Sequence, residues 1–244
     1  MIHQVPDRNI YKYRNFYRGI QILELNELYF EDPRNFPDIN DCSISIVDFT
    51  ATDQDIKTKI KANGKNRQEI RKNTAFYLKE RKKFSEVYRS EYSRKLDDIR
   101  ISCFSSGPDI YKMWTEYADN LQGMCIQFNS RFEIDPIFPY VVTYCEPLPK
   151  YNFFQENENI IVKTISTKLK SKYSFEKEIR LFHFGRITKI TFDSRLITSV
   201  ILGEKISNEN IEKIRRILKR SDLEHIALKK ASRNNFDGIL IEEI

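Results

Sequence analysis

Apolar residues recur along this chain with two spacings, one alternating and one repeating every three to four positions. Alternating or short continuous apolar runs predict strands, at residues 10–13, 28–30, 99–105, 124–128, 140–144, 175–184, 196–202, 224–230 and 238–243. The longer repeat predicts helices at residues 16–23, 109–121, 160–172 and 208–219. No repeat and no linker divides the chain, so we expect one mixed α/β globular domain over residues 1–244.

Residues 53–95 contain no proline and follow helical spacing, with Ile56 and Ile60 one turn apart. The pair Asn63-Gly64 interrupts the pattern, because glycine and asparagine commonly end helices. We therefore expect a short helix, a turn and one long helix over residues 66–95. We interpret residues 53–95 as a helical insertion laid over the core.

The net charge of +6 is unevenly distributed along the chain. Residues 57–95 hold 14 Lys and Arg but only 4 Asp and Glu. A basic segment of this kind attracts phosphate groups or an acidic partner. Lys79, Arg81, Lys82 and Lys83 form its densest cluster and are candidate contacts for a nucleic acid or another partner. The plainer alternative is a solvated helical face.

Several classes of protein and site are not indicated. No apolar run reaches about 18 residues and residues 1–17 have no apolar stretch, so neither a membrane span nor a secretion signal is predicted. The four cysteines lack a CxxC pair and have no ligand spacing with His3, His183 or His225, so we expect no metal site and reduced thiols in a cytoplasmic protein. Dinucleotide, Walker, hydrolase and kinase motifs are absent.

Four polar residues lie at predicted strand ends, where a cleft could gather them. Arg14 ends the first strand, Ser105 ends the strand at 99–105, and Glu176 and Glu178 open the strand at 175–184. Residues two apart in a strand share a face, so the two carboxylates should project together, and one should have a raised pKa unless cations such as Lys177 or Arg180 intervene. Paired carboxylates suit hydrogen bonding to a sugar hydroxyl and stabilisation of an oxocarbenium ion. Each residue also has a plainer interpretation, as a surface, turn or exposed strand residue.

These residues belong to a longer series of motifs that keeps its order along the chain. The series resembles the bacterial family called domain of unknown function 2971 over residues 10–202, and it comprises Tyr11-Lys12-Tyr13-Arg14, Asn26-Glu27-Leu28-Tyr29-Phe30, Cys103-Phe104-Ser105, Met113-Trp114-x-x-Tyr117-Ala118-x-x-x-x-Gly123 and Glu176-Lys177-Glu178 with Arg180. The chain departs from the family pattern at residues 36–41, so the resemblance assigns no role to that loop. It also has Tyr173 or Phe175 where the family has tryptophan.

The layout of this family is similar to that of ADP-ribosyltransferases. The resemblance implies an α+β fold with a split, mostly antiparallel sheet, an NAD substrate, no metal, and a macromolecular acceptor, nucleic acid or protein, in a toxin or phage-defence setting. Carried over, Arg14 would hold a phosphate or ribose of NAD, Ser105 the nicotinamide ribose, and Glu178 the ribose 2′-hydroxyl, while Glu176 would orient the acceptor. Tyr13 and Tyr117, in the same motifs, are further candidates for NAD contact. The alternative hypothesis is a nucleic-acid-binding module, non-catalytic or nuclease-type, that uses the basic helix.

Overall fold

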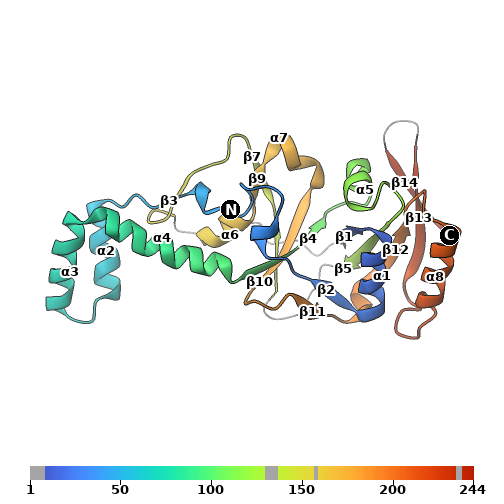
Figure 1. The fold of residues 1–244 in the computed structure, drawn as a ribbon, viewed down its shortest axis with the longest axis horizontal. Coiled ribbons are helices and arrows are strands. Elements are labelled where there is room, and N and C mark those ends of the chain that lie inside the picture. The colour runs from blue at the N-terminus through green and yellow to red at the C-terminus, as the bar shows by residue number, and fades with distance from the viewer. Residues whose placement is uncertain (1–8, 130–136, 157–158, 235–237) are drawn as a thin grey trace.

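An eight-stranded, mostly antiparallel sheet organises the chain in a computed structural model that describes residues 9–129, 137–156, 159–234 and 238–244 (Figure 1). The strands follow the order β14 (Ile239–Glu243), β13 (Ala227–Arg233), β12 (Ile197–Leu202), β5 (Met124–Asn129), β1 (Asn9–Arg14), β4 (Ile99–Ser105), β10 (Glu178–Phe184) and β6 (Phe138–Val141). Within this sheet β12 and β13 pair in parallel and the other neighbours are antiparallel. The expected α+β class and the mostly antiparallel sheet are confirmed.

Smaller elements surround this sheet. Three two-stranded sheets pair β2 (Glu27–Tyr29) with β11 (Lys189–Thr191), β3 (Val47–Asp48) with β8 (Tyr151–Asn152), and β7 (Thr143–Cys145) with β9 (Thr167–Leu169). The helices are α1 (Phe16–Leu25), α2 (Asp53–Asn63), α3 (Arg67–Lys79), α4 (Arg81–Asp97), α5 (Tyr111–Tyr117), α6 (Ile160–Ile165), α7 (Lys170–Tyr173) and α8 (Asn208–Leu218). Short 3₁₀ turns occupy residues 33–35, 44–46, 174–176 and 194–196.

The central strand β1 is bound very differently by its two neighbours. It pairs with β5 along its whole length, from Asn9 to Arg14. Its ladder with β4 consists of the pair Tyr11 and Ser105. Beyond that pair the buried Lys12 ammonium spans the gap, donating to the Ser102 hydroxyl at 2.8 Å and the Cys103 carbonyl at 2.9 Å. The two strands therefore diverge toward the end of β1.

Apolar side chains pack on both faces of the sheet. On one face α1 and α8 bury Phe16, Ile20 and Ile214 against residues of β5 and β10. On the other face α5 buries Trp114, whose indole lies edge-on to Tyr13 of β1 with ring centroids 5.3 Å apart. Because β1 lies between two covered faces, the polar groups at its end are held by a rigid frame.

The end of β1 is also fixed by a close backbone approach. Gly123, which follows α5, lies so near the carbonyl oxygen of Arg14 that a Cβ atom there would be 2.2 Å from it. Only glycine fits such an approach. Asn15 then caps α1 by accepting from the Arg18 amide at 2.9 Å. Arg14 is thus held between a strand end and a helix start.

The prediction of one long helix over residues 66–95 is wrong, because the chain forms two helices, α3 and α4, with a break at Glu80. Glu80 has φ −108° and ψ 48°, outside the helical region. The break folds α3 back so that Tyr77 contacts Phe84 of α4 at a centroid distance of 5.3 Å. Neither glycine nor proline marks this position in the sequence.

Two further predictions are corrected near the site. The expected helix over residues 160–172 is divided into α6, β9 and α7, because residues 167–169 pair with β7. The expected strand over residues 175–184 begins only at Glu178, since Lys177 takes a left-handed conformation with φ 44° after a 3₁₀ turn. The strand expected at residues 224–230 is present but lies further along the chain, as β13 at residues 227–233.

Helices α2, α3 and α4, called the helical arm below, extend away from the sheet rather than over it (Figure 1). The expectation that residues 53–95 are laid over the core is therefore wrong for α2 and α3, whereas the end of α4 packs on the core through Tyr92, in one cluster with Ile99 and Phe182. The arm has a small core of its own, with Ile56, Ile60 and Phe84 buried beside Ala51. A capping box between Thr52 and Asp55 starts it.

Candidate functional site

A pocket of about 260 Å³ lies where the end of β1 diverges from β4, beside the start of β10. It gathers residues from distant parts of the chain, including the loop at residues 36–41 and the strand β9. All six residues expected to contact NAD or to act in catalysis line it, namely Tyr13, Arg14, Ser105, Tyr117, Glu176 and Glu178. The strand ends named from the sequence therefore converge on one cavity.

Five charged side chains form a buried cluster along one wall of this pocket. The Lys168 ammonium donates to Glu176 at 2.5 Å and to Glu178 at 3.0 Å. The Arg180 guanidinium donates to both oxygens of Glu178, at 2.8 and 3.1 Å, and to both oxygens of Asp41, at 2.8 and 2.6 Å. Each of these side chains is at most 7% exposed. The cluster holds one more carboxylate than cations.

The two glutamates of this cluster titrate in opposite directions. Burial opposes ionisation of Glu178, but the charges of Arg180 and Lys168 outweigh it and lower the pKa of this carboxyl to about 2. Burial, followed by repulsion from Glu178, raises the pKa of Glu176. From the sequence, one of the two carboxyls was expected to have a raised pKa unless cations lay beside it. Cations do intervene at Glu178, and they are Arg180 and Lys168 rather than the exposed Lys177.

The carboxylates meet for a different reason from the one expected. Glu176 ends a 3₁₀ turn and does not lie in the strand with Glu178. The left-handed Lys177 reverses the backbone, and its carbonyl accepts from the Ser106 amide at 3.0 Å. The Ser105 hydroxyl donates to the Glu176 carbonyl at 2.7 Å. The end of β4 therefore holds the turn that brings both carboxylates to Lys168.

The hydroxyl groups of the expected NAD contacts are already hydrogen-bonded. Ser105 is fully buried and uses its hydroxyl on the Glu176 carbonyl. Tyr13 is 2% exposed and donates to the Gly107 carbonyl at 2.9 Å. Tyr117 is 40% exposed and donates to the Glu176 carboxylate at 2.6 Å. Of the three, Tyr117 presents a face that a ligand can reach.

Arg14 differs from the other pocket cations, Lys168 and Arg180, in having no carboxylate partner among the described residues. Its guanidinium donates to the Tyr13 carbonyl at 2.9 Å, and no described carboxylate lies within ion-pair distance. Burial lowers the pKa of Arg14, but guanidinium groups stay protonated in proteins. An anion entering the pocket would meet this group first among the pocket cations, since Lys168 and Arg180 are paired.

Some residues of the pocket were not predicted from the sequence, and the residues predicted to contact a partner lie outside the pocket. Lys168 and Asp41 were not expected, because neither follows a pattern and each is defined by long-range contacts. Aromatic side chains of the pocket were also missed as a set, namely Tyr11, Tyr29, Phe36 and Tyr173. The candidate partner contacts Lys79, Arg81, Lys82 and Lys83 lie on the helical arm, outside this pocket.

Comparisons of the chain with protein-family models, curated proteins and solved structures found no match. The family resemblance therefore stays a prediction. Across the described residues, which exclude His3, no three side chains of His, Cys, Asp or Glu are grouped so as to hold a metal ion. In the same part of the chain no helix has both the length and the apolar character needed to cross a membrane.

Proposed function

We propose that the pocket binds NAD and that the protein transfers ADP-ribose from NAD to a macromolecular acceptor. The observation that carries this proposal is the separation of charge within one cavity. Arg14, which no carboxylate of the described residues pairs with, lies at the end of β1, and the cluster with excess carboxylate lies by the start of β10. NAD has the complementary separation, with a pyrophosphate and a cationic nicotinamide ring.

Arg14 is the proposed contact for the pyrophosphate. A guanidinium binds phosphate oxygens with two parallel hydrogen bonds, and this is stronger in a partly buried site than in water. The neighbouring Lys12 is already engaged by Ser102 and Cys103, and burial, followed by the charge of Arg14, lowers its pKa, so it is not free to bind phosphate. The loss of Arg14 alone should therefore remove most of the attraction for the phosphates.

The rest of the pocket lining suits the nicotinamide ring and its ribose. Aromatic faces attract a cationic ring, and Tyr11, Tyr29 and Phe36 line the pocket. The excess carboxylate favours positive charge, which develops on the ribose as the C1′–nitrogen bond breaks. The bonding electron pair leaves with nicotinamide, which departs as a neutral molecule.

The two glutamates would then have separate roles. Glu178 stays ionised at neutral pH and would stabilise the oxocarbenium ion, with the ribose 2′-hydroxyl joining the donors already on its carboxylate. Glu176, with its raised pKa, would accept the proton that the acceptor loses when it attacks C1′. Ser105 would act as a positioning residue through the Glu176 carbonyl rather than by touching NAD.

The shape of the sheet and the size of the pocket also support this proposal. A sheet that opens between two central strands is what the resemblance to ADP-ribosyltransferases implies, and the ladder of β1 with β4 is limited to one pair. A volume of about 260 Å³ is close to the lower end for small-molecule pockets. It would enclose the nicotinamide riboside half of NAD, leaving the adenosine half outside.

Calorimetric titration with NAD, together with a nicotinamide-release assay, tests the proposal. The wild type should bind NAD and release nicotinamide, and Arg14→Ala should weaken binding by at least about tenfold, the scale of a charge-assisted hydrogen bond. Arg18→Ala is the matched control, because Arg18 is a nearby exposed arginine that does not line the pocket. If the wild type neither binds NAD nor releases nicotinamide, the proposal is wrong.

A further inference from the structure

The helical arm carries a large excess of unpaired positive charge. Of the 14 Lys and Arg at residues 57–95, 13 are exposed and only Lys59 is partly covered. Among these exposed cations, ion pairs within the described residues hold only Arg81, with Asp53, and Lys83, with Glu80. Like charges placed this densely repel one another, so the bare arm is less stable than a neutral one. A polyanion would relieve that repulsion.

One face of α3 combines this charge with an exposed aromatic ring. Lys72, Phe76 and Lys79 lie four and three residues apart, and so share a face of the helix. Phe76 is 47% exposed although it is large and apolar. The Lys83 ammonium of α4 lies 5.6 Å from the centre of its ring. These four side chains, with Lys82 beside them in sequence, are called the Phe76 patch.

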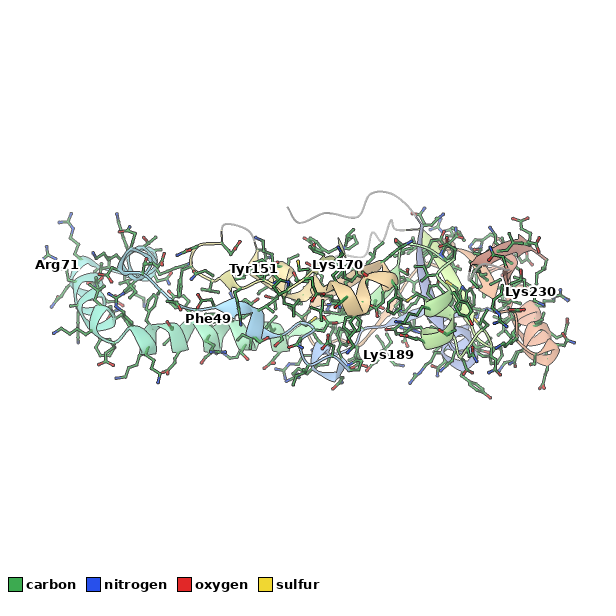
Figure 2. All side chains as sticks on the ribbon, turned by 90° about the horizontal axis from the view of Figure 1, so that it is seen from above. Phe49, Arg71, Tyr151, Lys170, Lys189 and Lys230 are labelled. Carbon is green, nitrogen blue, oxygen red and sulfur yellow. The ribbon has the colours of Figure 1, made fainter. Side chains whose placement is uncertain are left out.

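Tyr77, Phe84 and Tyr88 pack in the core of the arm, and Tyr92 packs in the core beside the sheet. Phe84 is buried and contacts Tyr77, Tyr88 and Phe154. Phe76 lies edge-on to Tyr77 with ring centroids 5.1 Å apart, but it stays 47% exposed, unlike the residues of the arm core. Figure 2 shows that the arm also reaches one end of the long axis at Arg71, far from Lys230 near the other end.

We propose that the Phe76 patch binds single-stranded nucleic acid, with a base stacked on Phe76 and phosphates on Lys72, Lys79 and Lys82. An exposed aromatic ring flanked by cations matches a strand in which each base lies between phosphates. In a duplex the bases are stacked on one another and unavailable to the ring, so the exposed phenylalanine favours the single strand. The Phe76 patch shares no residue with the NAD pocket, so this inference does not depend on the proposed function.

Fluorescence anisotropy of a labelled single-stranded RNA of about 20 nucleotides tests the proposal. Affinity of the full chain should fall steeply as salt rises, because bound phosphates release counterions. Changing Lys72, Lys79 and Lys82 to Glu should lower the magnitude of the log–log salt slope by about 2, because each neutralised phosphate of a single strand contributes roughly 0.7 to it. Phe76→Ala should weaken binding by about 5- to 150-fold, the range for one stacked base.

A matched triple variant controls for the loss of charge. Lys213, Arg216 and Lys219, changed to Glu, remove three exposed cations on or next to α8, and α8 lies at the opposite end of the molecule (Figure 1). This variant should keep wild-type affinity and slope, with circular dichroism confirming that every variant is folded. The proposal is overturned if the wild type does not bind, if both triple variants lose affinity equally, or if Phe76→Ala has no effect and duplex binds equally well. Binding of phosphatidylglycerol vesicles without binding of RNA would also overturn it.

Discussion

The Ser105 hydroxyl donates a hydrogen bond to the backbone carbonyl of Glu176, across 71 positions of sequence, at 2.7 Å. Both groups are buried, and the bond joins the end of β4 to the turn that precedes β10. Because the two candidate catalytic glutamates flank the turn residue Lys177, this single contact connects the stability of the sheet to the geometry of the site.

Ser105→Ala should therefore destabilise the protein more than a serine substitution usually does. The variant leaves the buried Glu176 carbonyl without this donor, at a cost of about 1–3 kcal/mol. Urea denaturation measures the difference. Ser106→Ala is the control, since the neighbouring serine is only partly buried and contributes its backbone amide, which alanine retains. Equal stability of the two variants would contradict the importance of the Ser105 hydroxyl.

Arg180 holds two carboxylates at once, and its replacement by methionine should be among the most damaging single changes. Asp41 and Glu178 would be left buried with only Lys168 to balance them. Removing one partner of a buried ion pair costs about 3–5 kcal/mol. As a control, Arg186→Met removes an exposed arginine paired with Asp98 and should cost less than about 1 kcal/mol. Chemical denaturation measures the unfolding free energy of both variants. Similar destabilisation of the two would contradict the prediction for Arg180.

The pH dependence of stability should reveal the buried charge of Glu178. Its pKa in the folded protein is about 2, below the ordinary value of 4.5. Its stabilising contribution, about 3 kcal/mol, is therefore present above pH 4.5 and is lost as the pH falls toward 2. Glu176, with a raised pKa, acts in the opposite direction, so wild-type stability alone does not isolate Glu178.

A difference between variants isolates it. The loss of unfolding free energy in Glu178→Gln should be large at pH 7 and should shrink as the pH approaches 3. The exposed Glu209→Gln variant controls for the removal of a carboxylate. Urea titrations at several pH values provide the data. A loss in Glu178→Gln that stays constant from pH 7 to pH 3 would show that the ion pairs of Glu178 do not account for its effect.

Patterns of local spacing predicted two of the strands beside this site, β4 and β5. Residues 99–105 form β4 as expected, and the expected strand at 124–128 is β5 with one residue more. Their alternation reflects burial on the faces of a sheet, which is a local property of the sequence. The convergence of Arg14, Ser105 and Glu178 followed from their positions at strand ends.

What depended on distant contacts could not be predicted. Residues 167–169 form a strand only because β7 lies beside them, and that pairing places Lys168 between the glutamates. The break at Glu80 has no glycine or proline and depends on ring packing between α3 and α4. The sequence named Ser105 correctly as a pocket residue, but its hydrogen-bond partner is the backbone carbonyl of Glu176, a contact that side-chain patterns do not specify.

Tyr117 offers a test that separates a catalytic role for Glu176 from a structural one. Its hydroxyl donates to the Glu176 carboxylate at 2.6 Å and so favours the ionised form. Removing that donor in Tyr117→Phe should raise the pKa of Glu176 further, because burial and Glu178 continue to oppose its ionisation. If Glu176 accepts a proton during transfer, the acidic limb of the kcat/KM profile for nicotinamide release and transfer moves to higher pH. Tyr29→Phe is the control, since Tyr29 lines the same pocket without a hydrogen bond from its hydroxyl to any described residue. An acidic limb that stays in place in Tyr117→Phe, with Tyr29→Phe unchanged as well, would remove Glu176 from the proton transfer and leave it only a part of the buried charge cluster.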